Sequence, residues 1–174
     1  MAVNRLNHAV LYVRDIERSV AFYAEVLGFE VISRLGGIQS AAFLRAQGST
    51  NDHDLGLFAI GRDASGSSAG RGEVGLYHLA WEVDTLADLR RLQGALAGRG
   101  ALVGATDHGT TKSLYARDPD GLELELAWLV PAELLDEAAL EASSRIARLD
   151  LDAEERRYGS ATLGGVGISR PAAV

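Results

Sequence analysis

Cysteine is absent from the 174-residue chain. Its absence excludes disulfides, thiolate metal ligands and thiol nucleophiles, so any metal site must use histidine and carboxylate side chains. No apolar run approaches the roughly 20 residues that a membrane-spanning helix needs. The first residues lead into the apolar stretch 6–13 without a signal-peptide pattern, so we expect a cytoplasmic protein with no membrane partner.

Basic residues are also in the minority, with 17 Lys and Arg against 24 Asp and Glu and a net charge of −7. Binding to nucleic acid phosphates requires a basic face, so we expect no nucleic acid partner. Charged residues make up 24% of the chain and hydrophobic residues 47%, which is ordinary for a globular protein of this length with one core. The composition therefore favours an ordinary globular protein without a nucleic acid partner.

The apolar pattern predicts the same order of elements twice, one strand, one helix and three strands. Module one covers about residues 5–60, with strands at 6–13, 29–35, 38–46 and 54–60 and a helix at 16–27. Residues 61–72 are rich in Gly, Ser and Ala and predict a linker. Module two covers about 74–130, with strands at 75–83, 102–105, 113–116 and 122–129 and a helix at 86–97.

The spacing of single residues supports this internal repeat. His8 lies five positions before Val13, and His78 lies five positions before Val83. A glycine follows each histidine after twenty positions, at 28 and at 98, where it would end the helix. Repetition at this period indicates one supersecondary unit built twice, so residues 1–130 are expected to form one domain.

Residues 131–174 lie outside the repeat. The Ala-, Leu- and Glu-rich stretch 131–149 predicts one helix that begins with Pro131 in its first turn. Residues 150–158 are mostly charged, and 159–174 are rich in Gly, Ala and Ser. An arm packed on a partner subunit or beside the active site and a frayed tail are both open interpretations.

The stretch 106–125 gathers the polar residues that need an explanation. Asp118-Pro119-Asp120-Gly121 predicts a tight turn, because Pro fixes φ and Gly tolerates positive φ. After the turn, apolar and acidic residues alternate, which places Glu123 and Glu125 on one face of a strand. These two carboxylates could lie on a solvated face of the sheet, or one of them could bind a metal.

The whole stretch resembles the signature of extradiol ring-cleavage dioxygenases. The matching features are His108, the Leu114-Tyr115 pair, the Asp-Pro-Asp-Gly turn and Glu125, at fixed spacings over twenty positions. These enzymes belong to the vicinal oxygen chelate superfamily, together with glyoxalase I and fosfomycin-resistance proteins. The resemblance covers about residues 5–130. It implies an α+β fold in which two βαβββ modules pair into one open, cup-shaped mixed sheet with helices outside.

The resemblance also implies a metal site. His8 and His78, at equivalent places in the two modules, and Glu125 in the last strand correspond to the metal ligands of the family. Two histidines and one carboxylate form the facial triad of non-haem Fe(II) oxygenases, which leaves coordination positions open. The implied cofactor is Fe(II), with Mn(II) as a possible substitute. The spacing after the turn favours Glu125 over Glu123 as the ligand.

Three further residues match catalytic positions of the family. His53 corresponds to an acid–base catalyst, a role that suits histidine because its pKa lies near neutral pH. A solvated loop histidine is the alternative for this position. His108 and Tyr115 correspond to the pair that hydrogen-bonds the oxygens of the substrate. A buried tyrosine hydroxyl needs a partner in any case, so a structural role for Tyr115 stays open.

The resemblance therefore implies an Fe(II)-dependent extradiol dioxygenase that cleaves a catechol-type aromatic diol with both atoms of O₂. Such an enzyme would serve aromatic hydrocarbon catabolism, and we expect it to be a homo-oligomer. A glyoxalase-like lyase or isomerase usually needs a fourth ligand, a glutamate in module one, and no Glu occurs between Glu30 and Glu73. A fosfomycin-type thiol transferase would leave His53 and His108 without a role, and a metal-free binding protein would not need the ligands.

Overall fold

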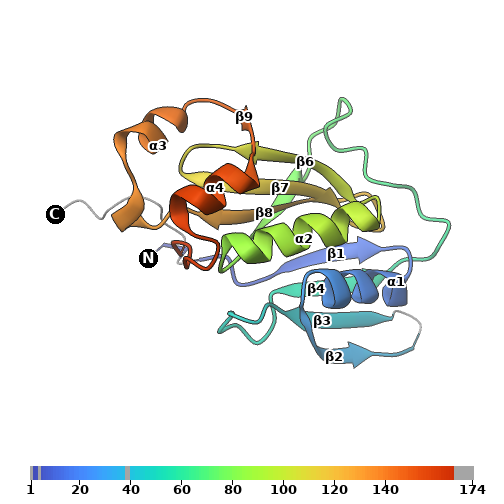
Figure 1. Ribbon diagram of the computed structural model, residues 1–174. Helices are drawn as coiled ribbons and strands as arrows, with labels where there is room; N and C mark the ends of the chain where they lie inside the picture. The colour runs from blue at the N-terminus through green and yellow to red at the C-terminus, as the bar shows by residue number, and fades with distance from the viewer. Residues whose placement is uncertain (1, 4, 38–39, 167–174) are drawn as a thin grey trace. The chain divides into compact units, whose positions relative to one another are not determined.

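The computed structural model describes residues 2–3, 5–37 and 40–166 and divides into two compact units (Figure 1). Unit 1 comprises Met1–Ser67 with Asp118–Gly121, and unit 2 comprises Ser68–Arg117 with Leu122–Val174. Positions 38–39 of the predicted third strand and 167–174 of the predicted tail lie outside the described residues. Each unit contains one mixed sheet.

Unit 1 has the strand order β1-β4-β3-β2. β1 and β4 are parallel, and the other pairs are antiparallel. The strands are β1 (Ala9–Val13), β2 (Glu30–Leu35), β3 (Ala41–Arg45) and β4 (Leu55–Ala59). The single helix predicted after β1 has two parts, α1 (Ile16–Ala21) and the π-helix η1 (Phe22–Val26).

The ends of this helical segment follow from local chemistry. The Asp15 carboxylate accepts hydrogen bonds from the backbone N–H groups of Glu17 and Arg18, which have no partner within the helix. Gly28, with φ of 79°, turns the chain into β2. Alternate residues of the strands, including Leu55 and Leu57 of β4, are buried in the core of the unit.

Unit 2 repeats the plan and extends it by one strand, in the order β5-β8-β7-β6-β9. β5 is parallel to β8, as β1 is to β4. The strands are β5 (His78–Glu82), β6 (Leu102–Asp107), β7 (Thr111–Arg117), β8 (Glu123–Leu129) and β9 (Ala147–Arg148). These two open mixed sheets with their helices confirm the predicted α+β class.

The helix of module two is α2 (Leu86–Gly98), which lies against the sheet of unit 2 (Figure 1). Leu89, Leu92 and Leu96 form its buried apolar stripe. The residue that caps the helix is Thr85. The Thr85 hydroxyl accepts a hydrogen bond from the backbone N–H of Asp88.

The prediction of one helix over 131–149 is wrong. The stretch instead forms the 3₁₀ turn η2 (Ala132–Leu134), the helix α3 (Glu137–Ala142) and the short strand β9. Asp136 caps α3 by accepting from the N–H of Ala139. After α3, the Ser143 and Ser144 hydroxyls bond to backbone carbonyls three residues back, which competes with continuation of the helix.

The charged residues 150–158, for which no element was predicted, form the helix α4 (Leu151–Tyr158). Asp150 accepts from the N–H of Ala153 at its start, and Gly159 ends it with φ of 88°. Leu151, Glu154 and Tyr158 are its buried residues. By contacts, residues 131–166 belong to unit 2, and the predicted single domain over 1–130 stays a prediction. In the described part of the chain, no helix has the length and apolarity to cross a membrane.

Candidate metal and substrate site

Two of the predicted metal ligands meet in unit 2. His78 begins β5, and Glu125 lies on β8, the neighbouring parallel strand. The His78 Nε2 atom lies 3.1 Å from Glu125 Oε2, and the two side chains are 25% and 14% exposed. Two ligand atoms about 2.1 Å from one ion and at right angles to each other lie about 3 Å apart. The pair therefore fits two adjacent positions around a divalent ion.

The other carboxylate oxygen of Glu125 accepts hydrogen bonds from two hydroxyl groups. Ser113 Oγ donates to Oε1 at 2.6 Å, and the Tyr115 hydroxyl donates to the same atom at 3.3 Å. Both donors lie on β7, two residues apart and therefore on one face of the sheet. The carboxylate is thereby oriented with Oε2 toward His78.

His108 extends this chain of polar groups. It follows β6, and its Nε2 atom lies 3.0 Å from the Tyr115 hydroxyl oxygen. Burial, then the charge of Glu125 and the hydrogen bond to it, raises the pKa of Tyr115 to about 12. The phenol therefore keeps its proton at neutral pH. When that proton is donated to Glu125, the His108 Nε2–H is the donor to the phenol oxygen.

Glu123 has a different environment from Glu125. Its carboxylate forms an ion pair of 2.9 Å with Arg117 at the exposed start of the β7–β8 hairpin. Glu123 is the residue opposite His78 in the register of the two parallel strands, but the His78 Nε2 atom lies 3.1 Å from Glu125 Oε2. The geometry favours Glu125 as the residue that faces His78.

The remaining two histidines lie together in unit 1. The ring centroids of His8 and His53 are 4.6 Å apart, and the His53 ring lies 5.0 Å from that of Phe43 in an edge-to-face arrangement. Asn7 Oδ1 lies 2.7 Å from His8 Nδ1. The His53 ring therefore contacts both His8 and Phe43, and His8 Nδ1 already has a polar partner.

Asp54 fixes the loop that leads to His53. Its carboxylate accepts hydrogen bonds from Ala46 N–H, Ser49 Oγ and Asn51 Nδ2. The side chain is nearly buried and its oxygens are engaged in the loop. Asp54 is therefore a structural residue rather than a free carboxylate ligand.

The strand registers identify the module-one counterpart of Glu125. In unit 2, Glu125 pairs with Ala80, two residues after His78. In unit 1, the residue two positions after His8 is Val10, and it pairs with Gly56. Gly56 thus occupies the place where a fourth ligand would be expected. A Cβ atom there would approach Val10 Cγ2 to 3.3 Å and Phe43 Cε1 to 3.6 Å.

The predicted site residues thus form two sets, one in each unit. In unit 2, His78, Glu125, Tyr115 and His108 form one connected set, and in unit 1, His8 and His53 form another. Across the described ranges, no three His, Asp or Glu side chains are gathered in a group that could hold a metal ion. Sequence reasoning missed Ser113, although its place two residues before Tyr115 puts it on the same strand face.

Comparison with known proteins assigns the family. The chain belongs to the Glyoxalase/Bleomycin resistance protein/Dioxygenase superfamily, whose family model matches residues 5–126. In this superfamily, relatives include extradiol dioxygenases, lactoylglutathione lyases and fosfomycin resistance proteins. Members bind divalent metals, such as Mn(II) in one fosfomycin resistance protein. The match confirms the vicinal oxygen chelate fold.

Individual relatives point to more than one activity. The catechol-2,3-dioxygenase of Bacillus subtilis (strain 168) is 30% identical over 122 residues, which cover 70% of this chain and 40% of that enzyme. A lactoylglutathione lyase of Neisseria meningitidis is 29% identical over 124 residues, covering 70% of this chain and 88% of the lyase. The chain therefore spans two fifths of the dioxygenase and most of the lyase.

Among solved structures, a glyoxylase/bleomycin resistance protein/dioxygenase domain from Frankia sp. EAN1pec is similar to this chain. The TM-score is 0.61 at 26% sequence identity, and the match covers 72% of this chain and 92% of that domain. The residues after 130 therefore lie largely beyond the part that defines the family.

Proposed function

We propose that the protein is an Fe(II)-dependent extradiol dioxygenase acting on a catechol-type aromatic diol. The observation that carries the proposal is Gly56, which stands in β4 at the register position that Glu125 holds in β8. A site with three protein ligands keeps coordination positions open for a chelating diol and for O₂, whereas a fourth carboxylate would fill one of them. Mn(II) is the possible substitute.

The proposed ligands are His8, His78 and Glu125. His78 and Glu125 supply two adjacent ligand atoms at a suitable separation, and the Ser113 hydroxyl holds the Glu125 carboxylate by its other oxygen. A ferrous ion bound by this triad would supply Lewis acidity and one-electron chemistry with O₂, which protein side chains lack. His8 would complete the triad from module one.

The remaining residues have proton-transfer and orienting roles in the proposal. His53 would accept a proton from one diol hydroxyl, because imidazole is an efficient base near neutral pH. Phe43, whose ring lies against His53, would give the aromatic diol an apolar surface. The His108 Nε2–H and the Tyr115 hydroxyl, which bond to Tyr115 and Glu125 in the structure, would be redirected as donors to the substrate oxygens.

A glyoxalase-like metal-dependent lyase is the second candidate. The 88% coverage of the Neisseria meningitidis lyase favours it, since the chain accounts for most of that enzyme and less than half of the catechol dioxygenase. The engaged carboxylate of Asp54 and the glycine at position 56 weigh against it. A fosfomycin-type thiol transferase is a further candidate, but such an enzyme would leave His53 without a role.

The deciding experiment is anaerobic loading with Fe(II), followed by a panel of diols and then oxygen. Catechol, 3-methylcatechol and 2,3-dihydroxybiphenyl are suitable, because ring fission of each yields a yellow product. The proposal expects colour with O₂ consumed in equal amount. Tight Fe(II) binding without colour, together with turnover of a hemithioacetal, would instead establish the lyase. Cytoplasmic location and homo-oligomeric assembly belong to the same proposal and are tested by fractionation and light scattering.

A further inference from the structure

The His108 hairpin, residues 108–110 between β6 and β7, is held by the C-terminal extension, residues 131–166. Within the hairpin, His108 N–H donates to Thr111 O and Thr110 N–H donates to His108 O. The extension lies outside residues 5–126, which define the family. It approaches the hairpin at three separate places, all within unit 2.

The first contact is between α3 and the tip of the hairpin. Gly109 has φ of 74°, and a Cβ atom on it would lie 2.3 Å from Ala139 O and 2.6 Å from Ser143 N. Such distances are far shorter than any side chain tolerates, so only glycine fits at this position. The backbone of the extension therefore packs directly on the residue that follows His108.

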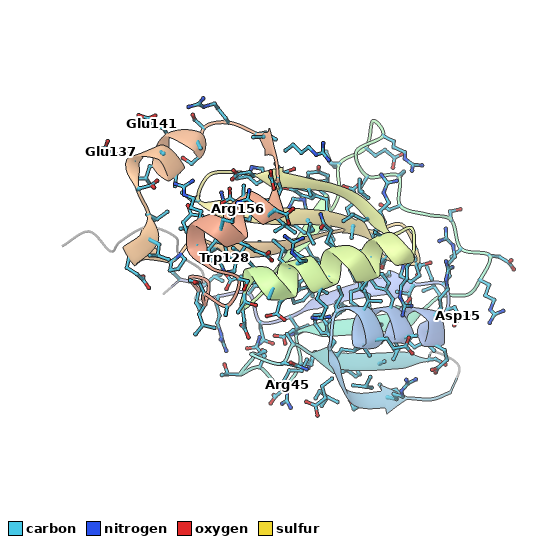
Figure 2. The ribbon with its side chains drawn as sticks, viewed as in Figure 1. Asp15, Arg45, Trp128, Glu137, Glu141 and Arg156 are labelled. Carbon is cyan, nitrogen blue, oxygen red and sulfur yellow. The ribbon has the colours of Figure 1, made fainter. Side chains whose placement is uncertain are left out.

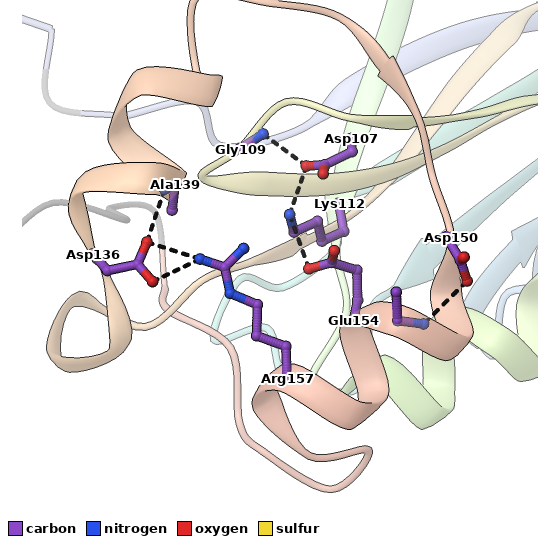
Figure 3. Close-up of polar contacts among 9 residues, drawn as sticks. Asp107, Gly109, Lys112, Asp136, Ala139, Asp150, Glu154 and Arg157 are labelled. Carbon is purple, nitrogen blue, oxygen red and sulfur yellow. Dashed lines mark hydrogen bonds and ion pairs between the residues drawn. The ribbon is translucent and has the colours of Figure 1, made fainter.

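The second contact is an ion-pair chain that begins in α4 (Figure 3). Glu154 Oε2 lies 3.0 Å from Lys112 Nζ, which lies 2.5 Å from Asp107 Oδ1. Asp107 Oδ1 also accepts the backbone N–H of Gly109 at 2.7 Å. The Lys112 side chain is 1% exposed, so its charge depends on these two carboxylates for compensation.

The third contact is strand β9, which pairs with the end of β6. Arg148 is opposite Thr106, and Ala147 is opposite Asp107. The residue immediately before His108 is therefore fixed through its backbone by β9 and through its carboxylate by Lys112. α3 therefore contacts the hairpin itself, and α4 and β9 contact the residues that flank it.

We propose that the C-terminal extension is a clamp that positions His108 for substrate binding, with Glu154 and Lys112 as its positioning residues. The proposal rests on the proposed function for the role of His108, but the clamp itself can be tested without substrate. Asp107 and Gly109 flank His108, so holding both restricts the backbone that presents the imidazole to Tyr115 at 3.0 Å. Loss of the Glu154 charge would leave Lys112 with Asp107 alone and loosen the hairpin.

The test compares Glu154→Gln with Glu141→Gln in the full chain. Glu141 lies on the outer side of α3, is exposed, and has its side chain directed away from the sheet, so its substitution makes the same charge change in the same extension without touching the hairpin (Figure 2). Amide hydrogen exchange at Gly109 and the ¹⁵N chemical shifts of the His108 ring are recorded by NMR. Both measurements are made without metal or substrate.

The clamp predicts faster exchange at Gly109 and shifted His108 ring signals in Glu154→Gln, with Glu141→Gln unchanged. If the dioxygenase assay succeeds, kcat should fall by up to about 10²-fold in Glu154→Gln with iron content retained, as small misplacements of orienting groups cause. Asp107→Asn, which keeps the acceptor oxygen but lowers its charge, is the milder variant if Glu154→Gln does not fold.

Unchanged exchange and unchanged His108 signals in both Glu154→Gln and Asp107→Asn would overturn the clamp. If wild-type protein cleaves no diol but the exchange and ring signals change as expected, the proposed function fails and the clamp stands. If the wild type is active and Glu154→Gln has wild-type kcat and KM, a positioning role for the extension in the reaction is rejected.

Discussion

The two sheets share a topology and differ in the polar groups that they present. Both place their first strand parallel to their fourth, with a histidine just before or at the start of the first strand. In unit 2 that histidine meets a carboxylate, which hydroxyl groups hold in place. In unit 1 the corresponding register position is Gly56, and the histidine lies beside a second histidine. The two sheets therefore share a backbone plan, but the histidine has an oriented carboxylate beside it in unit 2 and a second histidine beside it in unit 1.

The strongest test of this difference between the two sheets removes His78, the histidine at the start of β5. His78→Ala should abolish metal binding and turnover with the fold retained, because Glu125 then has only one histidine as co-ligand. Metal content after Fe(II) loading and circular dichroism measure the two effects. His53→Ala is the control, since it should bind iron normally. Full iron occupancy in His78→Ala would remove the ligand assignment.

A second variant makes the two sheets more alike. Gly56→Glu adds a carboxylate at the position that corresponds to Glu125 and should abolish ring cleavage with bound metal retained, because a fourth protein ligand fills an open coordination position. Gly56→Ala controls for the close approach of a Cβ atom to Val10. Wild-type turnover in Gly56→Glu would show that this position does not face the metal.

The proton-transfer role proposed for His53 is tested by His53→Ala. The variant should bind iron and diol normally and turn over roughly 10²–10⁴-fold more slowly, the usual contribution of general acid–base catalysis. Single-turnover kinetics under substrate saturation separates this effect from binding. His53→Gln, which keeps a polar side chain, should be equally slow. An unchanged rate in either variant would show that His53 is a loop residue without a catalytic role.

Loss of a hydroxyl group that hydrogen-bonds to Glu125 is expected to have a smaller effect on metal binding. Ser113→Ala removes the 2.6 Å hydrogen bond to Glu125 Oε1 and should weaken metal affinity by about 10–100-fold, as loss of a hydrogen bond to a metal ligand commonly does. Competition with a chelator gives the affinity. A control serine substitution in a loop of unit 1, Ser49→Ala, should leave affinity unchanged, because Ser49 bonds to Asp54.

The smallest effect is expected from Glu123→Gln. Its ion pair with Arg117 is partly exposed, so its loss should cost less than about 1 kcal/mol of unfolding free energy. Iron content should remain at the wild-type value if Glu125 is the ligand. Chemical denaturation and metal analysis provide the two measurements, and loss of iron would exchange the roles of the two glutamates.

The sequence predicted the elements that repeat a local pattern. Alternation in β8 placed Leu124 and Leu126 in the core and Glu125 on the opposite face, and the equivalent positions of His8 and His78 followed from their spacing. These features depend on strand periodicity, which is visible in neighbouring residues. The pairing of His78 with Glu125 followed from the family resemblance, and the geometry of unit 2 supports it.

Other features were not predicted from the sequence, some for local reasons and one because its residues lie far apart in the chain. The helix predicted over 131–149 failed because Asp136 starts a new helix and Ser143 and Ser144 bond back to the preceding turn. Both are local hydrogen bonds that compete with helix propensity. α4 had a readable signal in Asp150 followed by buried residues at 151, 154 and 158. Glu154 and Lys112 are 42 positions apart in the sequence, so no local pattern predicts their ion pair.

Strand β9 also has a consequence for association with other chains. An uncovered edge strand offers its backbone N–H and C=O groups to any extended peptide, including the same strand of another molecule. In unit 2, β9 occupies the outer side of β6 at Thr106 and Asp107. Two residues of the extension therefore protect that edge from intermolecular strand addition, and a variant that released β9 would expose a template for aggregation beside His108.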